Sequence, residues 1–495
     1  MLHKRIFNIP VLLFLTSLVL RLNLISLGPY HVDCLNLAIQ ANATLETGQL
    51  HNLFGFGYPL TVLLGSFFIW TCQLFNIYDL AFAVNLMSVV LSSLTVTVNY
   101  LFIARLINPA AAFFSSVMLS VFPIFLGLSI YGTSHIPAVL FLELGLLFLL
   151  KFKTDQRKSF LILSALSFGF MGGARIQDLV LMFVPINYFF YWCRQQNLDR
   201  KDLFISWLMF DGIIFTVAAL FHLPFLLDHS SAQYTNQLSS FAHQGLFGNF
   251  LGFFSWANYS YTFSILLWNL THVGVVLSFL GFIYLGIQRR GLCVFLFLWF
   301  LAPLLFYGNL NTTVSRFLMI SALPLIIAQG YYFSLMLQFK RKIFSIICVL
   351  CFSAIVITLI AFMYPRFLFR HQFALLPEFA RFVGQQTPAN AQVITGGEGL
   401  FINYYGSRKI IYRPSTMEPN DLLAFHNQID SLLADNIPVF ITSSGLYSGD
   451  DQKVFSNFLN KNYRLEYRGE RPTEDWHHGE IIQRIGKEKL FRIVR

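Results

Sequence analysis

Long apolar segments alternate with short polar ones along most of the chain. A helix needs about 20 apolar residues to cross a bilayer. Segments that approach or reach this length recur at 7–27, 80–104, 109–130, 137–152, 160–176, 178–193, 203–226, 264–287, 291–308, 317–338 and 343–364. This pattern predicts a polytopic membrane protein with about eleven transmembrane helices. Another apolar stretch, at 58–75, is long enough for a helix, and its place depends on the charges around it.

Basic residues before residue 365 gather in short clusters between the apolar segments. Short loops rich in Lys and Arg stay on the cytoplasmic side of a membrane. All the basic clusters lie on the same side of the membrane only if the stretch 58–75 does not cross the membrane. We therefore predict that 58–75 is an interfacial or re-entrant helix in the first outer loop. The N-terminus is then cytoplasmic. The clusters are Lys4 and Arg5; Arg105; Lys151, Lys153, Arg157 and Lys158; Arg194, Arg200 and Lys201; Arg289 and Arg290; and Lys340, Arg341 and Lys342.

The chain changes character at residue 365. From Pro365 to Arg495 it carries 16 Lys and Arg and 14 Asp and Glu, the mixture expected of a water-exposed surface. Helix-like residues 376–386 precede strand-like 392–397, and helix-like 420–436 precede strand-like 438–443. This alternation predicts a small α/β domain with a partly parallel sheet. We therefore divide the chain into a transmembrane domain, 1–364, and a soluble extracytoplasmic domain, 365–495.

Composition supports the membrane class. The 495 residues are 56% hydrophobic and 12% charged, and the mean hydropathy is +0.61, whereas soluble domains are about 25% charged. The net charge of +10 reflects topology, so no nucleic-acid partner is expected. The first apolar segment lacks a small-x-small cleavage site, which indicates a retained signal anchor. None of the six cysteines follows residue 351, and their spacing indicates neither a disulfide framework nor a metal site.

Three arginines of the membrane part, Arg21, Arg175 and Arg316, lie outside the cytoplasmic clusters. In the eleven-helix arrangement all three fall at or near outer helix ends. An arginine inside a span costs several kcal/mol unless it is paired or reaches the interface. Three separate interfacial anchors would explain them, but their shared side favours a common anionic ligand.

Acidic residues are scarce on the same side. Asp33 follows the first apolar segment by about six residues, and Asp178 is spaced to pair with Arg175 at (i, i+3). A lipid-linked phosphate leaving group needs charge neutralisation, which arginine supplies. An acceptor hydroxyl needs a general base within hydrogen-bond reach. A carboxylate and several arginines on one membrane face suit this reaction.

The order of these features resembles the GT-C glycosyltransferases that use polyprenyl-phosphate sugars, such as protein O-mannosyltransferases and aminoarabinose transferases. In that family an acidic motif follows the first span, then an interfacial stretch with Tyr-Pro, and two later motifs each hold an arginine. The matching stretches here are HVDCLNLAIQANATLETGQL at 31–50, FGFGYPLTVLLGSFF at 54–68, LSFGFMGGARIQDLVLMFVP at 166–185 and SRFLMISALPLIIAQG at 315–330.

The resemblance implies an inverting hexosyl- or pentosyltransferase that needs no obligatory cofactor or metal. Its donor is a polyprenyl-phosphate sugar, and its acceptor is a hydroxyl of a glycan, lipid or protein. The membrane is the plasma (inner) membrane, or the endoplasmic reticulum in a eukaryote. Cys34 stands where the family has a second acid, and His135 where many members carry one. The implied roles are catalytic base for Asp33 and lipid-phosphate binding for Arg175 and Arg316, to which we add Arg21 as a further candidate. Candidate substrate contacts are His31, His135, Tyr58 and Glu46, and a structural role for His135 before Pro137 fits the sequence equally well.

Two other functional classes fit the same pattern of segments. A transporter or lipid flippase would show internal repeats and ionisable residues near mid-membrane, whereas the unusual charges here lie at outer helix ends. A catalytically silent protein with the same fold is consistent with Cys34 in place of an acid. Sugar transfer measured on a panel of donors separates the glycosyltransferase from the other two classes, and substrate flux by the reconstituted protein separates the transporter from the silent protein.

Overall fold

The structure is a computed structural model of the chain. It describes residues 2–53, 58–194, 200–227, 256–309, 315–339, 342–414, 417–447, 450, 452–478 and 482–495. Of these, only the backbone is described at 2–7, 200, 474–478 and 482–485. Of the predicted cytoplasmic clusters, Lys340 and Arg341 and the side chains of Lys4, Arg5 and Arg200 lie outside the described residues. The chain forms two compact units. The first comprises Met1–Ile25 and Leu37–Phe369, and the second Ser26–Asn36, Arg370–His477 and Ile482–Arg495.

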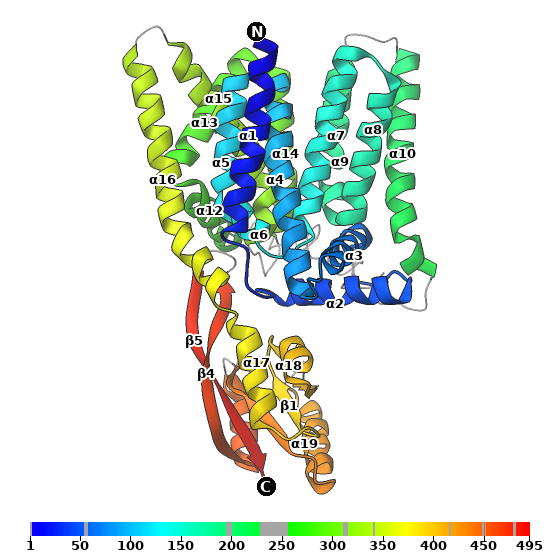
Figure 1. The fold of residues 1–495 in the computed structure, drawn as a ribbon, viewed down its shortest axis with the longest axis vertical. Helices are drawn as coiled ribbons and strands as arrows, with labels where there is room; N and C mark the ends of the chain where they lie inside the picture. Colours follow the sequence, from blue (N-terminus) through cyan, green and yellow to red (C-terminus); the bar gives the residue numbers. More distant parts are fainter. Residues whose placement is uncertain are drawn as a thin grey trace. The chain divides into compact units, whose positions relative to one another are not determined.

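Helices occupy all eleven predicted apolar segments, and in the first unit most of them run side by side (Figure 1). Seven are continuous over most of their length: α1 (Leu2–Leu22), α4 (Leu80–Leu106), α7 (His135–Asp155), α8 (Lys158–Ala174), α9 (Ile176–Arg194), α10 (Arg200–Leu227) and α14 (Arg290–Gly308). They are followed by α15 (Met319–Gln338), which a short 3-10 helix, η2 (Ser315–Leu318), precedes, and by α16 (Lys342–Gln372).

The two remaining segments are each broken into two helices. The first break separates α5 (Pro109–Val121) from α6 (Pro123–Ser129) by a 60° bend, at Phe122, which precedes a proline and has an extended backbone. The second separates α12 (Trp256–Leu270) from α13 (His272–Gln288) by 98° at Thr271. Thr271 has φ 64°, and its hydroxyl accepts from Gly274 N–H at 3.1 Å, which caps α13.

The region between the first two predicted spans holds α2 (Val32–Thr47) and α3 (Pro59–Leu74). As drawn in Figure 1, α3 runs crosswise to the long helices of its unit. The expected helix at 58–75 is therefore present, with proline as its first residue. Its interfacial location stays a prediction.

Seven helices among the described residues are long and apolar enough to cross a membrane, or nine if each bent pair is one crossing. α3, α8 and Asn8–Leu22 of α1 are shorter apolar helices. The chain is thus a multi-pass membrane protein by composition and helix length. The count of eleven spans and the side on which each end lies stay predictions.

The second unit contains a five-stranded sheet of order β2-β1-β3-β5-β4. β1 (Gln392–Thr395) pairs in parallel with β2 (Lys409–Tyr412) and with β3 (Val439–Thr442), and β3 pairs antiparallel with β5 (Ile482–Val494). β4 (Arg464–His478) is the edge strand. The predicted α/β domain with a partly parallel sheet is confirmed. The division of the chain into 1–364 and 365–495 stays a prediction, and the second unit also includes Ser26–Asn36.

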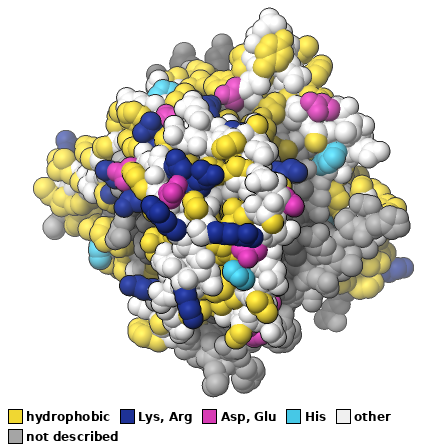
Figure 2. Space-filling model, turned by 90° about the horizontal axis from the view of Figure 1, so that it is seen from below, with side chains coloured by type: hydrophobic (Ala, Val, Ile, Leu, Met, Phe, Trp, Pro, Cys, Tyr) yellow, Lys and Arg dark blue, Asp and Glu magenta, His cyan; other side chains and the backbone are white. Residues whose placement is uncertain are grey.

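Six helices complete the second unit: α17 (Leu375–Gln386), α18 (Gly399–Gly406), α19 (Pro419–Ala434), α20 (Ser443–Tyr447), α21 (Val454–Asn462) and the end of α16. Apolar residues of α19 and α21, among them Phe425 and Phe455, form one core with strand residues such as Ile394 and Ile441. Oppositely charged surface pairs such as Arg468–Glu466 and Lys487–Glu470 match a water-exposed surface. Figure 2, seen from below, shows Lys and Arg side chains on one face with Asp and Glu among them.

Two glutamates lie buried where β1 and β3 end. Glu398 accepts hydrogen bonds from the hydroxyls of Thr442 and Ser444, and Glu488 of β5 accepts from Ser444 N–H at 2.5 Å. Burial and the nearby Glu398 carboxylate raise the pKa of Glu488 from its ordinary value of 4.5 to about 7. The GGEG sequence at 396–399 forms the turn from β1 into α18, and its glutamate belongs to this pair.

We expect Glu488→Gln to remove a pH dependence of stability in the second unit. The unfolded carboxyl loses its proton near pH 4.5, while the folded one keeps it to about pH 7. Wild-type stability therefore falls as pH rises from 4.5 to about 7, by about 3 kcal/mol in total. Hydrogen exchange of β3 and β5 amides in the full chain at pH 5 and pH 8 measures this. Glu466→Gln, on the surface beside Arg468, is the control and should retain the wild-type pH dependence.

Candidate functional site

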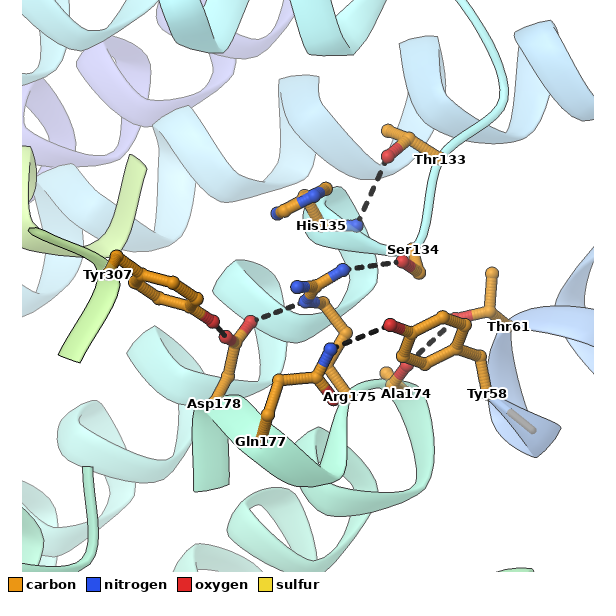
Figure 3. Close-up of polar contacts among 10 residues, drawn as sticks. All are labelled: Tyr58, Thr61, Thr133, Ser134, His135, Ala174, Arg175, Gln177, Asp178 and Tyr307. Carbon is orange, nitrogen blue, oxygen red and sulfur yellow. Dashed lines mark hydrogen bonds and ion pairs between the residues drawn. The ribbon is translucent and has the colours of Figure 1, made fainter. Parts of the chain in front are cut away.

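Helix ends of the first unit converge around Arg175. Arg175 is the extended residue between α8 and α9, with φ −156°, and its N–H donates to Met171 O at 2.7 Å. The N-terminus of α7, the N-terminus of α3 and the C-terminus of α14 bring side chains to the same place, as the close-up in Figure 3 shows. The break between α8 and α9 is therefore the centre of a polar cluster within an otherwise apolar bundle.

The centre of the cluster is a buried ion pair. Arg175 Nε donates to Asp178 Oδ2 at 2.8 Å, and both side chains are 3% exposed. This is the (i, i+3) pair that the sequence predicts. Asp178 lies in the first turn of α9, where backbone N–H groups and the helix dipole favour a carboxylate. Together the two side chains carry no net charge, so they can be buried among apolar residues. Burying an isolated arginine there would cost a large amount of free energy.

A tyrosine and an aromatic stack hold the carboxylate from the other side. Tyr307, near the end of α14, donates its hydroxyl proton to Asp178 Oδ1 at 2.7 Å. The Tyr307 ring stacks on Phe317 of η2, with 5.0 Å between centroids and 10° between planes. The Arg316 guanidinium lies 5.7 Å from the Phe317 ring. Arg316 and Arg175 thus belong to one neighbourhood, linked through Phe317, Tyr307 and Asp178.

The other side of Arg175 faces α3 and α7. Its Nη1 donates to the hydroxyl of Ser134, the residue directly before α7, at 2.9 Å. Its Cζ lies 5.3 Å from the ring centroid of Tyr58. Tyr58 has a left-handed backbone (φ 46°), which is uncommon for a residue other than glycine. Its hydroxyl accepts from Gln177 Nε2 at 2.6 Å, so α9 and the start of α3 are tied together.

One guanidinium nitrogen of this cluster is left with hydrogen-bonding capacity. Among the described residues, Arg175 Nη2 is buried and has no hydrogen-bond partner, and the same holds for Gln177 Oε1. Buried polar atoms are nearly always partnered, so each exception calls for an explanation. A donor on a fixed arginine suits an anionic oxygen, such as that of a phosphate.

His135 begins α7 beside this cluster. It is 6% exposed, its N–H donates to Thr133 Oγ1 at 3.3 Å, and its ring centroid lies 6.1 Å from that of Phe317. The structure therefore gathers four of the predicted site residues, Arg175, Arg316, Tyr58 and His135, in one region of the first unit.

Arg21 occupies a different set of contacts. It lies fully buried near the end of α1, donates to Ser17 and to Ser120 O, and its Cζ lies 5.1 Å from the ring of Phe125 in α6. These contacts bind α1 to the α5–α6 bend. Its role in phosphate binding stays a prediction.

Asp33 belongs to the second compact unit, in the segment Ser26–Asn36. It lies in the first turn of α2, and its side chain is 32% exposed. Its Oδ1 lies 3.3 Å from His31 Nδ1, which also accepts from the Asp33 N–H at 3.1 Å. Cys34, the next residue, is completely buried. Asp33 and His31 therefore form one polar pair that solvent can reach.

Glu46 lies at the far end of α2, where its Oε1 accepts from Asn42 at 2.8 Å. Asp79 caps α4 by accepting from Phe82 N–H at 3.0 Å. Across the described part of the chain, no three His, Cys, Asp or Glu side chains lie close enough together to hold a metal ion.

Sequence reasoning missed three members of the cluster: Ser134, Gln177 and Tyr307. Ser134 precedes a helix, which marks only a helix start. Tyr307 ends an apolar helix and reads as an interfacial aromatic. Their roles arise from contacts between distant helices, which no linear spacing reports.

We expect Tyr307→Phe to destabilise the folded protein by about 1–3 kcal/mol, because a buried carboxylate oxygen loses its donor. Asp178→Asn should cost more, about 3–5 kcal/mol, because it leaves Arg175 buried without a counter-charge. The apparent unfolding temperature in detergent measures both. Tyr78→Phe is the control, since this hydroxyl is exposed and donates to Asn76. Equal effects of Tyr307→Phe and Tyr78→Phe would contradict the assignment.

Comparison with known proteins agrees with the sequence motifs. Residues 63–222 match the family model described as dolichyl-phosphate-mannose-protein mannosyltransferase. This range contains Arg175 and Asp178. No curated protein sequence matches the chain.

Several solved structures share the fold. The oligosaccharyltransferase AglB of Archaeoglobus fulgidus, in complex with an inhibitory peptide and a dolichol-phosphate, has 13% identity and a TM-score of 0.61 over 96% of this chain and 74% of AglB. ArnT of Cupriavidus metallidurans, bound to undecaprenyl phosphate, has 10% identity and a TM-score of 0.55 over 98% and 97% of the chains. The mycobacterial arabinofuranosyltransferase AftD has 14% identity and a TM-score of 0.53 over 98% of this chain and 40% of AftD.

The matched regions extend over both compact units, since ArnT covers nearly the whole chain. At these identities the similarity establishes the fold, and the family model adds a sequence match across α3 to α10. The chain therefore has the GT-C fold, and its resemblance to the glycosyltransferases that use polyprenyl-phosphate sugars is confirmed.

Proposed function

We propose that this protein is a membrane glycosyltransferase that moves a sugar from a polyprenyl-phosphate carrier to an acceptor hydroxyl on the extracytoplasmic side. The observation that carries the proposal is the buried cluster at Arg175, in which one guanidinium nitrogen has no hydrogen-bond partner among the described residues. ArnT and AglB, which share the fold, bind undecaprenyl phosphate and dolichol-phosphate. A lipid phosphate is thus the anion that both the chemistry and the fold favour.

Arg175 is suited to stabilise a departing phosphate. Asp178 and Ser134 fix its guanidinium at 2.8 and 2.9 Å, so no large reorganisation is needed when negative charge develops on the leaving group. Arg316, in the same neighbourhood, supplies a second positive charge. With two arginines available for charge neutralisation, the proposed reaction requires no metal and no further cofactor.

Asp33 is the proposed general base. A third of its side chain is exposed, so an acceptor can approach it. The acceptor oxygen attacks the anomeric carbon as its proton passes to Asp33. The bond between that carbon and the phosphate oxygen breaks, and polyprenyl phosphate leaves with the electron pair. A single displacement of this kind inverts the anomeric configuration. His135, Tyr58 and Glu46 are proposed substrate contacts.

Asp33→Asn should reduce sugar transfer from a polyprenyl-phosphate donor about 10²–10⁴-fold, because the amide cannot accept the acceptor proton. Transfer by purified protein in detergent or liposomes, with a panel of lipid-phosphate sugars, measures this. Asp79→Asn is the matched control, since an asparagine still caps α4, and it should keep wild-type transfer.

Wild-type turnover by Asp33→Asn would overturn the assignment of the base. Movement of the donor lipid across liposomes by the wild type, without any glycosyl product, would favour a transporter instead. Lipid-phosphate binding without turnover on every donor would favour a catalytically silent protein.

Arg175→Lys should weaken the binding of undecaprenyl phosphate about tenfold, because lysine keeps the charge but loses the planar fork that Asp178 and Ser134 orient. Binding of the carrier lipid to the purified protein measures this effect. Arg105 lies in the last turn of α4, where it donates to Leu101 O. Arg105→Lys is the control and should bind the carrier lipid as the wild type does. Unchanged binding by Arg175→Lys would remove Arg175 from the phosphate site.

A further inference from the structure

The segment that carries Asp33 is built into the second compact unit. Ser26–Asn36 groups with Arg370–His477, although more than 300 residues separate them in the chain. Arg370, in the last turn of α16, is 1% exposed. A buried arginine needs specific surroundings to offset its lost hydration, and here the surroundings come from the Asp33 segment.

Arg370 meets that segment through its guanidinium and its backbone. The guanidinium Cζ lies 3.5 Å from the ring centroid of Tyr30, the separation of a direct cation–π stack. Leu27 N–H donates to Arg370 O at 3.1 Å. Side-chain stacking and a main-chain hydrogen bond therefore hold the four-residue stretch from Leu27 to Tyr30 against Arg370.

The start of α17 lies within van der Waals range of Gly28. A Cβ built on Gly28 would lie 3.4 Å from Ala374 Cβ and 3.6 Å from Pro377 Cγ. The hollow between Ser26–Tyr30 and the start of α17 measures about 10 Å³, which leaves no more room than a single water molecule needs. The segment is thus seated closely against the start of α17.

Tyr30 leads directly into the turn that presents Asp33. His31 O accepts from Cys34 N–H at 3.0 Å and from Leu35 N–H at 3.2 Å, and His31 Nδ1 accepts from Asp33 N–H. Fixing Tyr30 therefore fixes the start of α2. We propose that Arg370 is a positioning residue, which holds Tyr30 so that Asp33 is presented at the correct place for catalysis. This inference rests on the proposed function of Asp33.

Tyr30→Leu should lower kcat about 10- to 100-fold, as expected for a reacting group displaced by about 1 Å, while the KM for the lipid donor stays within about twofold. Tyr30→Phe keeps the aromatic ring over Arg370 and should keep wild-type kcat. A loss of kcat in both variants, or in neither, would overturn the proposal. Arg370→Lys serves in the same comparison if Tyr30→Leu does not fold.

A cross-link separates positioning from general stability. Gly28→Cys with Ala374→Cys places two Cβ atoms about 3.4 Å apart, close to the separation in disulfides. Added to Tyr30→Leu, the oxidised pair should restore at least half of the lost kcat, and reduction should remove the gain. A disulfide that forms without restoring kcat would overturn the proposal, as would failure of the disulfide to form in the Tyr30 wild-type background.

The proposed function and this inference fail in different ways. If the wild type transfers sugar from no donor, the proposed function fails. Disulfide formation and protease resistance of Ser26–Asn36 then still show whether Tyr30 and Arg370 anchor the segment. If the wild type is active and Tyr30→Leu loses nothing, only the positioning role fails.

Discussion

The buried pair of Arg175 and Asp178 is the constraint on which the rest of the membrane unit's polar architecture depends. A guanidinium inside an apolar bundle must have its charge balanced nearby. Because the two residues are three apart across the start of α9, the pair fixes where α8 ends and α9 begins. Ser134 and Tyr307 then draw the start of α7 and the end of α14 to the same point.

This pair differs from a purely structural salt bridge in one respect. A structural bridge is most stable when every donor and acceptor is used. Here Asp178 has both oxygens occupied by Arg175 and Tyr307, whereas Arg175 Nη2 is left over among the described contacts. The saturated carboxylate cannot rotate toward a new partner, so the arginine stays oriented when an anion arrives. Such preorganisation is what stabilisation of a leaving group requires.

Local signals in the sequence were enough for the helices and for the α/β unit. Apolar length located all eleven membrane-unit segments, and alternating helix and strand patterns located α17 with β1 and α19 with β3. The (i, i+3) spacing also identified the partner of Arg175. The breaks at Phe122 and Thr271 were missed, since only one carries a proline. Tyr307, Gln177 and the association of Tyr30 with Arg370 were missed because they depend on contacts between residues far apart in the chain.

Cys34 stands where the related glycosyltransferases have a second acid, and its environment explains why an acid would not suit this chain. The residue is completely buried, and burying a carboxylate without a partner is costly. Asp33 lies one position earlier on α2. Its side chain is about a third exposed, and His31 Nδ1 lies 3.3 Å from its Oδ1. The polar neighbour of Asp33 in this structure is therefore His31, two residues before it, and not the residue after it.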